Sequence, residues 1–483
     1  MKKSIRAVPI KLTLLFLSLF GMVSCGDDNN TGPIAPPPSS GSSQVAFWLT
    51  NPDKSVLFKR QTTSLNFKEA SNSYPTITID TTQTYQSIDG FGFTLTSGSA
   101  YVISRMSTTA RAEFLKEVFA PDSTFIGVSY LRLNLGASDL SPNVYSYNDL
   151  PAGQTDPTLA NFSLAPDQTY YLPVLKEILA VNPDIKLLAS PWSPPTWMKT
   201  NNNSKGGSLK PEFYGAYAQY LVKYIQAMKG EGITIDAITL QNEPRNGDNN
   251  PSMEMSATDQ ANFIKNNIGP ALQAAGLITK IIIYDHNLDQ PDYPISILND
   301  AQAKPYIDGS AFHLYAGSIG NLLQVRNAHP DKNLYFTEQY TATTGNFAGD
   351  LNWHVKNLIV GATRNYSRNV LEWSLAADAN NGPFINGGCT TCLPAVTVGA
   401  SSPVRNVAYY IIAHASKFVR PGSVRIASDI TGSLQNVAFK RPDGKKVLIV
   451  LNDSGTAQNF NISYRGKVVT TVLNGGAVGT YVW

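Results

Sequence analysis

Short apolar runs alternate with longer segments of helical periodicity from Tyr85 to Phe418. Each run has the length of a strand, is rich in β-branched or aromatic residues, and ends at polar or glycine positions. The eight runs are Gln86–Leu95, Val128–Gly136, Ile185–Trp192, Ile235–Glu243, Lys280–Asn287, Gly309–Tyr315, Asn333–Tyr340 and Asn369–Ala376. The helical segments between them are Ala110–Phe119, Thr169–Val181, Glu212–Lys229, Thr258–Ala275 and Asn352–Tyr366.

Eight strands that alternate with helices predict an α/β fold, a (β/α)8 TIM barrel over residues 81–419. An open, doubly wound sheet is the alternative for the same alternation. We favour the barrel because polar residues capable of chemistry follow the ends of many different strands. In a barrel, all of these ends open onto one face.

The segments on either side of the barrel have no helical periodicity. Residues 45–80 and 420–483 contain short alternating runs, separated by turns such as Pro442-Asp443-Gly444. This pattern is typical of a β-sandwich. Because neither segment alone has enough strands, we expect the N-terminal strands to join the C-terminal ones in one side domain.

The N-terminus has the features of an export signal. Basic residues precede an apolar run from Ile10 to Val23, and Met22–Cys25 resembles a bacterial lipoprotein box. An ordinary cleaved signal with a chance cysteine is the alternative. Residues 26–44 are rich in Asp, Asn, Pro, Gly and Ser, which predicts a flexible tether. We therefore expect residues 1–25 to be a lipoprotein signal peptide. We also expect the protein to be exported and anchored in the outer membrane or at the cell surface through a lipid on Cys25.

Composition narrows the classes of function. A net charge of +3 over 483 residues provides no basic patch, so we expect no nucleic-acid partner.

Cys389 and Cys392 form a Cys-x-x-Cys pair, which in an exported protein favours a small disulfide. Free thiols and a metal site are the alternatives, although zinc would need two more ligands and the sequence has no second Cys pair or nearby His.

Two glutamates end predicted barrel strands. Glu243 follows the fourth strand within Asn-Glu-Pro, and Glu338 ends the seventh. A lone glutamate at a strand end is usually a surface carboxylate, but two such residues in one barrel can converge on one cleft. Glycoside hydrolysis needs this pair: one carboxylic acid protonates the leaving oxygen, and one carboxylate faces the anomeric carbon.

The chain resembles glycoside hydrolase family 30, and in particular its bacterial β-1,6-glucanase-like members, over nearly all of its length after the tether. The motifs that carry the resemblance are Ile88–Gly92, Leu131-Arg132-Leu133, Ser138-Asp139, Ala189–Lys199, Gln241–Pro244, Phe312–Tyr315, Phe336–Glu338 and Lys417–Ser423. The family has a barrel fused to a β-sandwich with strands from both termini, which agrees with the pattern described above.

The resemblance implies a retaining reaction with Glu243 as general acid/base and Glu338 as nucleophile. It implies that Asn242 contacts the 2-hydroxyl of the sugar, and it requires no metal or organic cofactor. The other implied substrate-site residues are the walls Trp192 and Trp373, the nucleophile's neighbours His313 and Tyr315, its charge partner Arg132, and Asn287. Asn287 ends the run Asp285–Asn287, which we expect to provide further hydroxyl contacts.

The two carboxyl groups need different pKa values for these roles. We expect the pKa of Glu243 to be raised by a neighbouring negative charge or partial desolvation, so that it starts protonated. We expect Arg132 and hydrogen bonds to hold the pKa of Glu338 low.

One position departs from the glucocerebrosidase-like members of the family. They have an Asp, which anchors hydroxyls of the terminal glucose, where this chain has Ser97. The runs Gly90–Thr96 and Gly387–Cys392 look more like bacterial members that act on β-1,6-linked glucan. We therefore expect a polysaccharide substrate and cleavage of β-1,6-linked glucan. The alternatives are glucosylceramidase-like β-glucosidase, β-xylosidase or xylanase activity and, more remotely, a non-catalytic carbohydrate-binding lipoprotein.

Overall fold

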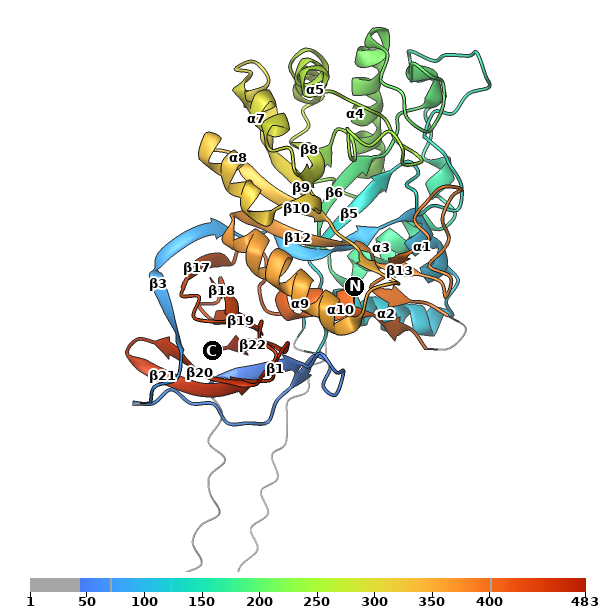
Figure 1. The fold of residues 1–483 in the computed structure, drawn as a ribbon. Helices are drawn as coiled ribbons and strands as arrows, with labels where there is room; N and C mark the ends of the chain where they lie inside the picture. The colour runs from blue at the N-terminus through green and yellow to red at the C-terminus, as the bar shows by residue number, and fades with distance from the viewer. Residues whose placement is uncertain (1–43, 70–71, 123, 400–401) are drawn as a thin grey trace, which may run out of the picture. The chain divides into compact units, whose positions relative to one another are not determined.

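The computed structural model describes residues 44–69, 72–122, 124–399 and 402–483 (Figure 1). The predicted signal peptide, the cysteine that we expect to be lipidated (Cys25) and nearly all of the predicted tether lie outside these residues. Within the described ranges, no helix is both long enough and apolar enough to cross a bilayer.

Eight parallel strands close into a barrel. In chain order they are β4 (Gly90–Leu95), β5 (Tyr130–Leu135), β6 (Lys186–Pro191), β7 (Ala237–Thr239), β8 (Lys280–Leu288), β9 (Ile307–Gly317), β10 (Asn333–Glu338) and β12 (Ser367–Ser374). Each strand pairs with the next, and β12 pairs with β4 to complete the ring. The predicted TIM barrel is confirmed, and the alternative of an open sheet is wrong.

Helices follow most of the barrel strands and surround them (Figure 1). They are α1 (Ser97–Ser104), α2 (Thr108–Phe119), α3 (Tyr171–Val181), α4 (Tyr214–Gly230), α5 (Ala257–Phe263), α6 (Gly269–Ala274), α7 (Asp292–Asn299), α8 (Leu322–Ala328), α9 (Phe347–His354) and α10 (Val407–Ser416). A π-helical stretch, Ile264–Ile268, joins α5 to α6, and another, Val355–Ala362, continues α9. Helix α9 begins before the predicted Asn352 because the side chain of Asn346 caps it by accepting from the Gly349 N–H.

The side domain contains strands from both ends of the chain. They are β1 (Ala46–Thr50), β2 (Lys59–Arg60), β3 (Thr76–Ser87), β17 (Val424–Ser428), β18 (Leu434–Lys440), β19 (Lys446–Asn452), β20 (Gln458–Tyr464), β21 (Lys467–Leu473) and β22 (Val478–Val482). Strand β1 pairs with β22, and β3 lies between β17 and β20, which confirms the predicted β-sandwich. Strand β3 continues past the predicted boundary at residue 80 because it stays paired with β17 as far as Ser87.

Strands β18 and β19 of the sandwich contribute side chains both to the core of the sandwich and to the core of the barrel. On β18 and β19, Phe439 and Ile449 belong to the core of the barrel, whereas Ala438 and Leu448 belong to the core of the sandwich. Successive side chains on a strand point to opposite faces, so both faces of these strands are buried. This explains why Val447–Leu451 is an unbroken apolar run.

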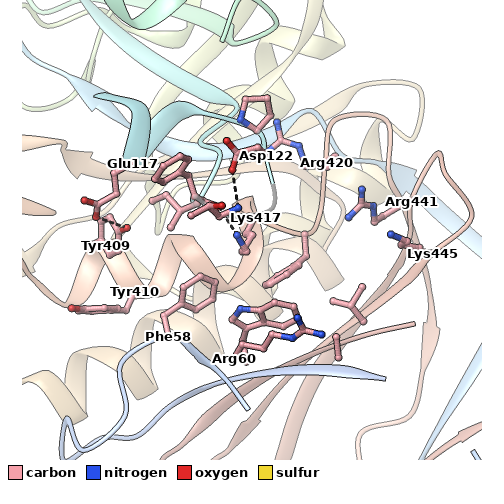
Figure 2. Close-up of a pocket in the computed structure, with 18 of the residues that line it drawn as sticks. Phe58, Arg60, Glu117, Asp122, Tyr409, Tyr410, Lys417, Arg420, Arg441 and Lys445 are labelled. Atoms are coloured by element: carbon pink, nitrogen blue, oxygen red, sulfur yellow. Dashed lines mark hydrogen bonds between the residues drawn. The ribbon is translucent and has the colours of Figure 1, made fainter. Parts of the chain in front are cut away.

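A cavity of about 1000 Å³ lies where the sandwich meets the barrel, and basic and aromatic side chains line it (Figure 2). Its half-buried carboxylate, Glu117, already accepts hydrogen bonds from Arg405 at 2.7 Å and from the Tyr409 hydroxyl at 2.8 Å. Its other acidic lining residue, Asp122, is exposed to solvent. This cavity therefore has no carboxylate pair suited to glycoside hydrolysis.

Short strands carry the Cys-x-x-Cys loop to the barrel mouth. Strand β11 (Thr341–Ala342), which follows β10, pairs with β14 (Cys392–Leu393). Strand β13 (Ala376–Ala377), which follows β12, pairs with β15 (Val396–Thr397), and β15 pairs with β16 (Val404–Arg405). These pairings place the loop after the last barrel strand beside the end of β10.

Candidate active site

A cleft of about 340 Å³ lies at the carboxyl ends of the barrel strands. Its lining residues are Asp139, Trp192, Glu243, Asn246, Asn249, Asn287, Tyr315, Glu338, Tyr340, Trp373, Cys389 and Cys392. This face of a TIM barrel is the usual position of the active site.

Glu243 and Glu338 converge on this cleft. One carboxylate oxygen of each lies within 4.8 Å of the other, and the two residues are only 7% and 6% exposed. Glu243 has a φ of 48°, a left-handed conformation that costs a non-glycine residue about 1–2 kcal/mol. Backbone strain of this kind is concentrated at functional sites.

Arg132, on β5, lies fully buried beneath the pair. Its Nη1 donates to Glu338 Oε2 at 2.5 Å. Its Nη2 donates to Asp285 Oδ2 at 2.8 Å and to Asn242 Oδ1 at 2.6 Å. The buried guanidinium is therefore balanced by two carboxylates, and it orients three side chains of the site.

His313, on β9, bridges the two glutamates. Its Nδ1 lies 3.2 Å from Glu243 Oε1 and 3.8 Å from Glu338 Oε1, and its Nε2 lies 3.1 Å from Asp285 Oδ1. Burial disfavours a charge on the ring, but the negative charges around it outweigh burial and raise the pKa of His313 to about 9. The ring is fully buried, so it lies under the cleft rather than lining it.

Glu243, His313 and Glu338 also form a possible metal-binding group, because their ligand atoms lie within 4.8 Å of one another. A metal requires a free lone pair on the imidazole. Both ring nitrogens of His313 face carboxylates, and a pKa of about 9 keeps both protonated at neutral pH. The group is therefore better suited to sharing protons than to binding a cation.

The pKa values of the pair are opposite to the sequence-based expectation. Burial opposes the charge of Glu243, but the hydrogen bond and charge of His313 outweigh it and lower the Glu243 pKa to about 2. Burial raises the pKa of Glu338, the charge of Glu243 adds to this, and His313 and Arg132 oppose it. The expectation took Arg132 into account but not His313, which hydrogen-bonds Glu243 and lies farther from Glu338.

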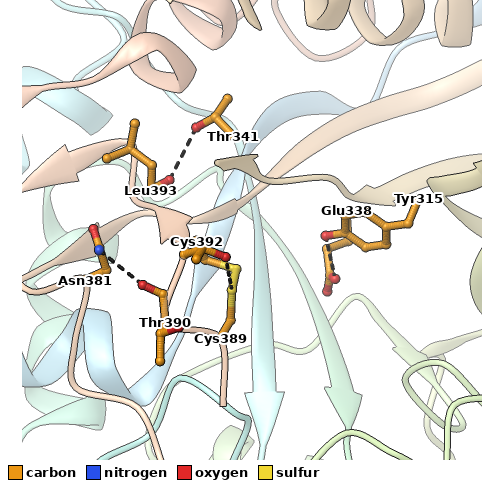
Figure 3. The surroundings of a disulfide bond; sticks show 9 residues. Tyr315, Glu338, Thr341, Asn381, Cys389, Thr390, Cys392 and Leu393 are labelled. Atoms are coloured by element: carbon orange, nitrogen blue, oxygen red, sulfur yellow. Dashed lines mark hydrogen bonds between the residues drawn. A yellow bond between two sulfur atoms is a disulfide. The ribbon is translucent and has the colours of Figure 1, made fainter. Parts of the chain in front are cut away.

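Aromatic and amide side chains form the walls of the cleft. The Tyr315 hydroxyl donates to Glu338 Oε1 at 3.0 Å (Figure 3). The rings of Trp192 and Trp373 lie 5.5 Å apart, centroid to centroid. Asn287 lies beside Tyr315 and accepts a hydrogen bond from its backbone N–H at 3.0 Å. The structure thus brings these predicted site residues together around Glu338.

Cys389 and Cys392 form a disulfide in the structure (Figure 3). Both residues line the cleft on the side where β14 pairs with β11. The spacing of the two cysteines favoured this bond, but no feature of the sequence indicated that their loop forms a wall of the cleft.

Sequence reasoning also missed or misassigned polar groups. Asp285 was expected to contact hydroxyls, but it is fully buried and accepts hydrogen bonds from Thr239 and Thr337 at 2.8 and 2.7 Å. Asn246 was not predicted, and its amide donates to Glu243 Oε2 at 2.8 Å. Its position three residues after Glu243 is the signal that could have identified it.

Comparison with known proteins agrees with this geometry. The model of the glycosyl hydrolase family 30 TIM-barrel domain matches residues 88–419, and that of the family 30 beta sandwich domain matches residues 422–481. The chain belongs to glycosyl hydrolase family 30. This membership confirms the predicted class of enzyme, a glycoside hydrolase.

This family 30 enzyme is similar to known proteins and to solved structures. The chain is 36% identical over 437 residues to the endo-1,6-beta-D-glucanase of Neurospora crassa, and the match covers 83% of this chain and 89% of that protein. It is 30% identical to putative glucosylceramidase 2 of Caenorhabditis elegans, covering 83% and 82%. Among solved structures, the endo-beta1,6-glucanase BT3312 has a TM-score of 0.84 and 35% identity, covering 92% of this chain and 99% of that one. SrfJ of Salmonella typhimurium has a TM-score of 0.85 and 27% identity, covering 91% and 99%.

Proposed function

We propose that this family 30 enzyme is a retaining hydrolase of β-1,6-linked glucan, with Glu338 as nucleophile and Glu243 as general acid/base. The distance of at most 4.8 Å between their carboxylate oxygens carries the proposal. Retaining enzymes hold the two carboxyl groups roughly 5–5.5 Å apart, whereas inverting enzymes need roughly 6.5–9.5 Å to admit a water. The short distance favours direct attack by Glu338.

Two observations support the β-1,6 linkage. The Neurospora crassa relative and BT3312 are both named as β-1,6-glucanases, and this chain spans most of each. Ser97, at the position of the hydroxyl-binding Asp, is fully buried with its hydroxyl 2.5 Å from that of Ser141. A serine held in this way argues against the glucosylceramidase-like alternative.

The first step requires a proton on Glu243. In the free cleft, this proton is on His313 Nδ1, 3.2 Å from Glu243 Oε1, and a shift along the hydrogen bond gives neutral His313 and protonated Glu243. Glu338 then attacks the anomeric carbon while Glu243 protonates the glycosidic oxygen, and the bond between that oxygen and the carbon breaks. The products are a glycosyl ester on Glu338 and the released alcohol.

The second step reverses these roles. Ionised Glu243 takes a proton from water, and the water oxygen attacks the anomeric carbon. The bond between this carbon and Glu338 then breaks. Each displacement inverts the configuration at the anomeric carbon, so the β configuration is restored.

Asn242 is positioned to bind the sugar. Arg132 donates to Oδ1 of Asn242, which leaves the amide nitrogen of Asn242 to donate to the 2-hydroxyl of the sugar.

An NMR time course of pustulan hydrolysis tests this proposal, with laminarin, xylan and gentiobiose as parallel substrates. We expect pustulan to be cleaved in preference to the others, and the β-anomer of the new reducing end to appear first. Initial α-product would exclude retention. Release of sugar from xylan or laminarin but not from pustulan would exclude the β-1,6 linkage.

His313→Asn is expected to narrow the pH profile of kcat/KM from both sides. In the wild type, the proton shared by His313 and Glu243 is lost as the pH rises through about 9, which sets the basic limb. Without the imidazolium, Glu243 alone holds this proton and releases it at lower pH. The positive charge near Glu338 is also lost, so the Glu338 pKa rises and the acidic limb moves to higher pH. Rates on an aryl β-glycoside across pH check this, and an unchanged profile would contradict it.

We also propose that the enzyme is exported and anchored at the outer membrane or cell surface through a lipid on Cys25. The basic and apolar N-terminus and the Met22–Cys25 box support this proposal. Metabolic labelling with palmitate is expected to label the wild type and not Cys25→Ala, and the variant should leave the membrane fraction. Equal labelling of both proteins would exclude lipidation at Cys25.

A further inference from the structure

The cavity where the sandwich meets the barrel is a second candidate binding site. Among the described residues, its lining and that of the catalytic cleft have no member in common. Its volume of about 1000 Å³ suits a small molecule, since sites for such ligands occupy roughly 300–1000 Å³ and often lie between domains. Its basic lining residues outnumber the acidic ones: they are Arg60, Arg405, Lys417, Arg420, Arg441 and Lys445, against Glu117 and Asp122 (Figure 2).

Two of these cations are balanced by the acidic lining residues. Arg405 donates to both carboxylate oxygens of Glu117, at 2.7 and 2.5 Å. The Lys417 ammonium donates to the Phe125 carbonyl at 2.7 Å. Burial lowers the pKa of Lys417, and the nearby charge of Asp122 partly offsets this effect. The other four cations of the lining have no such acidic partner in it.

Arg420 and Arg441 bring two guanidinium groups close together. Arg420 Nη1 donates to the carbonyls of Gly127 and Ser416, and Arg420 forms no ion pair with a carboxylate of the described residues. Burial and the charge of Arg441 lower the pKa of Arg420. The buried Nε of Arg441 has no hydrogen-bond partner within the described part of the chain. A bound anion would satisfy this donor and offset the repulsion between the two groups.

The turn between β18 and β19 adds a third cation at this corner of the cavity. Arg441 and Lys445 lie in this turn, and the Arg441 N–H donates to the Lys445 carbonyl at 2.8 Å. Asp443, in the same turn, lies 3.0 Å from Arg441 Nη2 and 4.0 Å from Lys445 Nζ. One carboxylate therefore faces two cations of the turn, and Arg420 adds to their charge. This corner is positively charged and suits an anion.

Aromatic side chains form another wall of the cavity. The rings of Trp48 and Phe418 lie 4.5 Å apart and are tilted by 53°, and the Phe58 ring lies 6.1 Å from that of Phe418. Phe58 has a φ of 43°, a left-handed conformation that is unfavourable for a residue other than glycine and that is often found at functional sites. The Arg60 guanidinium lies 5.5 Å from the centre of the Trp48 ring. This wall suits a ligand with an apolar face.

We propose that this cavity binds a phosphorylated sugar, with its phosphate on Arg420, Arg441 and Lys445 and its ring against Trp48 and Phe418. A phosphate monoester has a charge of about −1.5 to −2 and three acceptor oxygens, so it accepts from several cations at once. A carboxylate has one charge and two oxygens, which matches three cations less well. Guanidinium groups bind phosphate with two parallel hydrogen bonds. The tilted rings suit the puckered C–H face of a sugar better than a flat base, which stacks between parallel rings.

Isothermal titration calorimetry of the protein with glucose 6-phosphate tests the site. Inorganic phosphate and glycerol 3-phosphate, which carries the phosphate of a lipid headgroup, have no ring, and glucose has no phosphate. We expect one glucose 6-phosphate to bind per chain, about 10-fold or more tightly than each of the other three, because it alone makes both sets of contacts. Absence of saturable binding would overturn the proposal. Equal affinity for either ringless phosphate would show that the aromatic wall does not recognise the sugar, and would overturn it too.

The double variant Arg441→Gln, Lys445→Gln locates the binding. It is expected to weaken glucose 6-phosphate binding roughly 10- to 100-fold, because charge-assisted hydrogen bonds to the phosphate are lost. Arg465→Gln is the matched control, since Arg465 lies in another hairpin turn of the sandwich, over the Tyr464 ring and outside the cavity lining. It should bind glucose 6-phosphate as the wild type does.

Thermal melting shows whether the double variant keeps its fold. If it does not, Lys445→Gln alone replaces it, because the Lys445 side chain is 58% exposed and contributes little to packing. This single variant is expected to weaken binding about 3-fold, as one exposed charge is removed. Wild-type affinity in the folded variant, or an equal loss in Arg465→Gln, would place the ligand elsewhere and reject the site.

Discussion

Glu338→Gln is expected to lower the rate of β-1,6-glucan hydrolysis by on the order of 10⁴-fold or more, the scale on which removal of a catalytic nucleophile acts. Gln has nearly the same shape as Glu but cannot form the glycosyl ester. It also loses the charge that Arg132 Nη1 contacts at 2.5 Å. Reducing-sugar release from pustulan measures the effect, and trapping with a 2-fluoro glycoside should label the wild type but not the variant.

The control for this experiment is Glu177→Gln. Glu177 pairs with Arg111 at 2.7 Å and its side chain is 41% exposed, so its ion pair contributes little to stability and nothing to the cleft. This variant should retain wild-type activity. Substantial turnover by Glu338→Gln, or labelling of a residue other than Glu338, would show that the nucleophile has been assigned wrongly.

Glu243→Gln is expected to lower glucan hydrolysis roughly 10²- to 10⁴-fold, the range for general acid–base catalysis. The effect should depend on the leaving group, because dinitrophenolate departs without a proton and a sugar alkoxide does not. With a dinitrophenyl glycoside, the variant should form the glycosyl enzyme quickly and hydrolyse it slowly, giving a burst of released phenol. Azide needs no general base, so it should restore turnover and yield a β-glycosyl azide.

Stopped-flow absorbance and NMR of the azide product measure these outcomes. An equal loss on both substrates without rescue would reject Glu243 as the acid/base. The Asn246 amide, which donates to Glu243 Oε2 at 2.8 Å, can still bond the Gln side-chain oxygen, so the variant should keep the local structure.

Much of the fold was readable from local patterns. The run Lys280–Asn287 matches β8 closely because its part Ile281–Tyr284, buried on both faces, is continuously apolar whatever its neighbours are. The starts of helices were less accurate, as α9 shows: its first turn depends on the cap at Asn346 rather than on apolar spacing. The end of β3 depends on its pairing with β17, which lies far along the chain.

Only part of the site could be predicted from the sequence. The positions of Glu243 and Glu338 after the fourth and seventh strands were predictable because parallel strands in a barrel end on one face. The distribution of charge was not, since it depends on which carboxylate His313 contacts more closely. The partner of Arg132 Nη1 lies 206 residues away, a separation at which no local pattern specifies a contact.

The sequence alone determined the succession of strands and helices, the positions of Glu243 and Glu338 at strand ends and the likeness to one family. Each of these follows from periodicity or from a motif within a few residues. The tertiary structure alone decided the distance of at most 4.8 Å between the carboxylates, the position of His313 between them and the use of the disulfide loop as a wall. These features depend on how separate barrel strands and loops pack against one another. That packing sets distances and pKa values to within the small margins that catalysis requires.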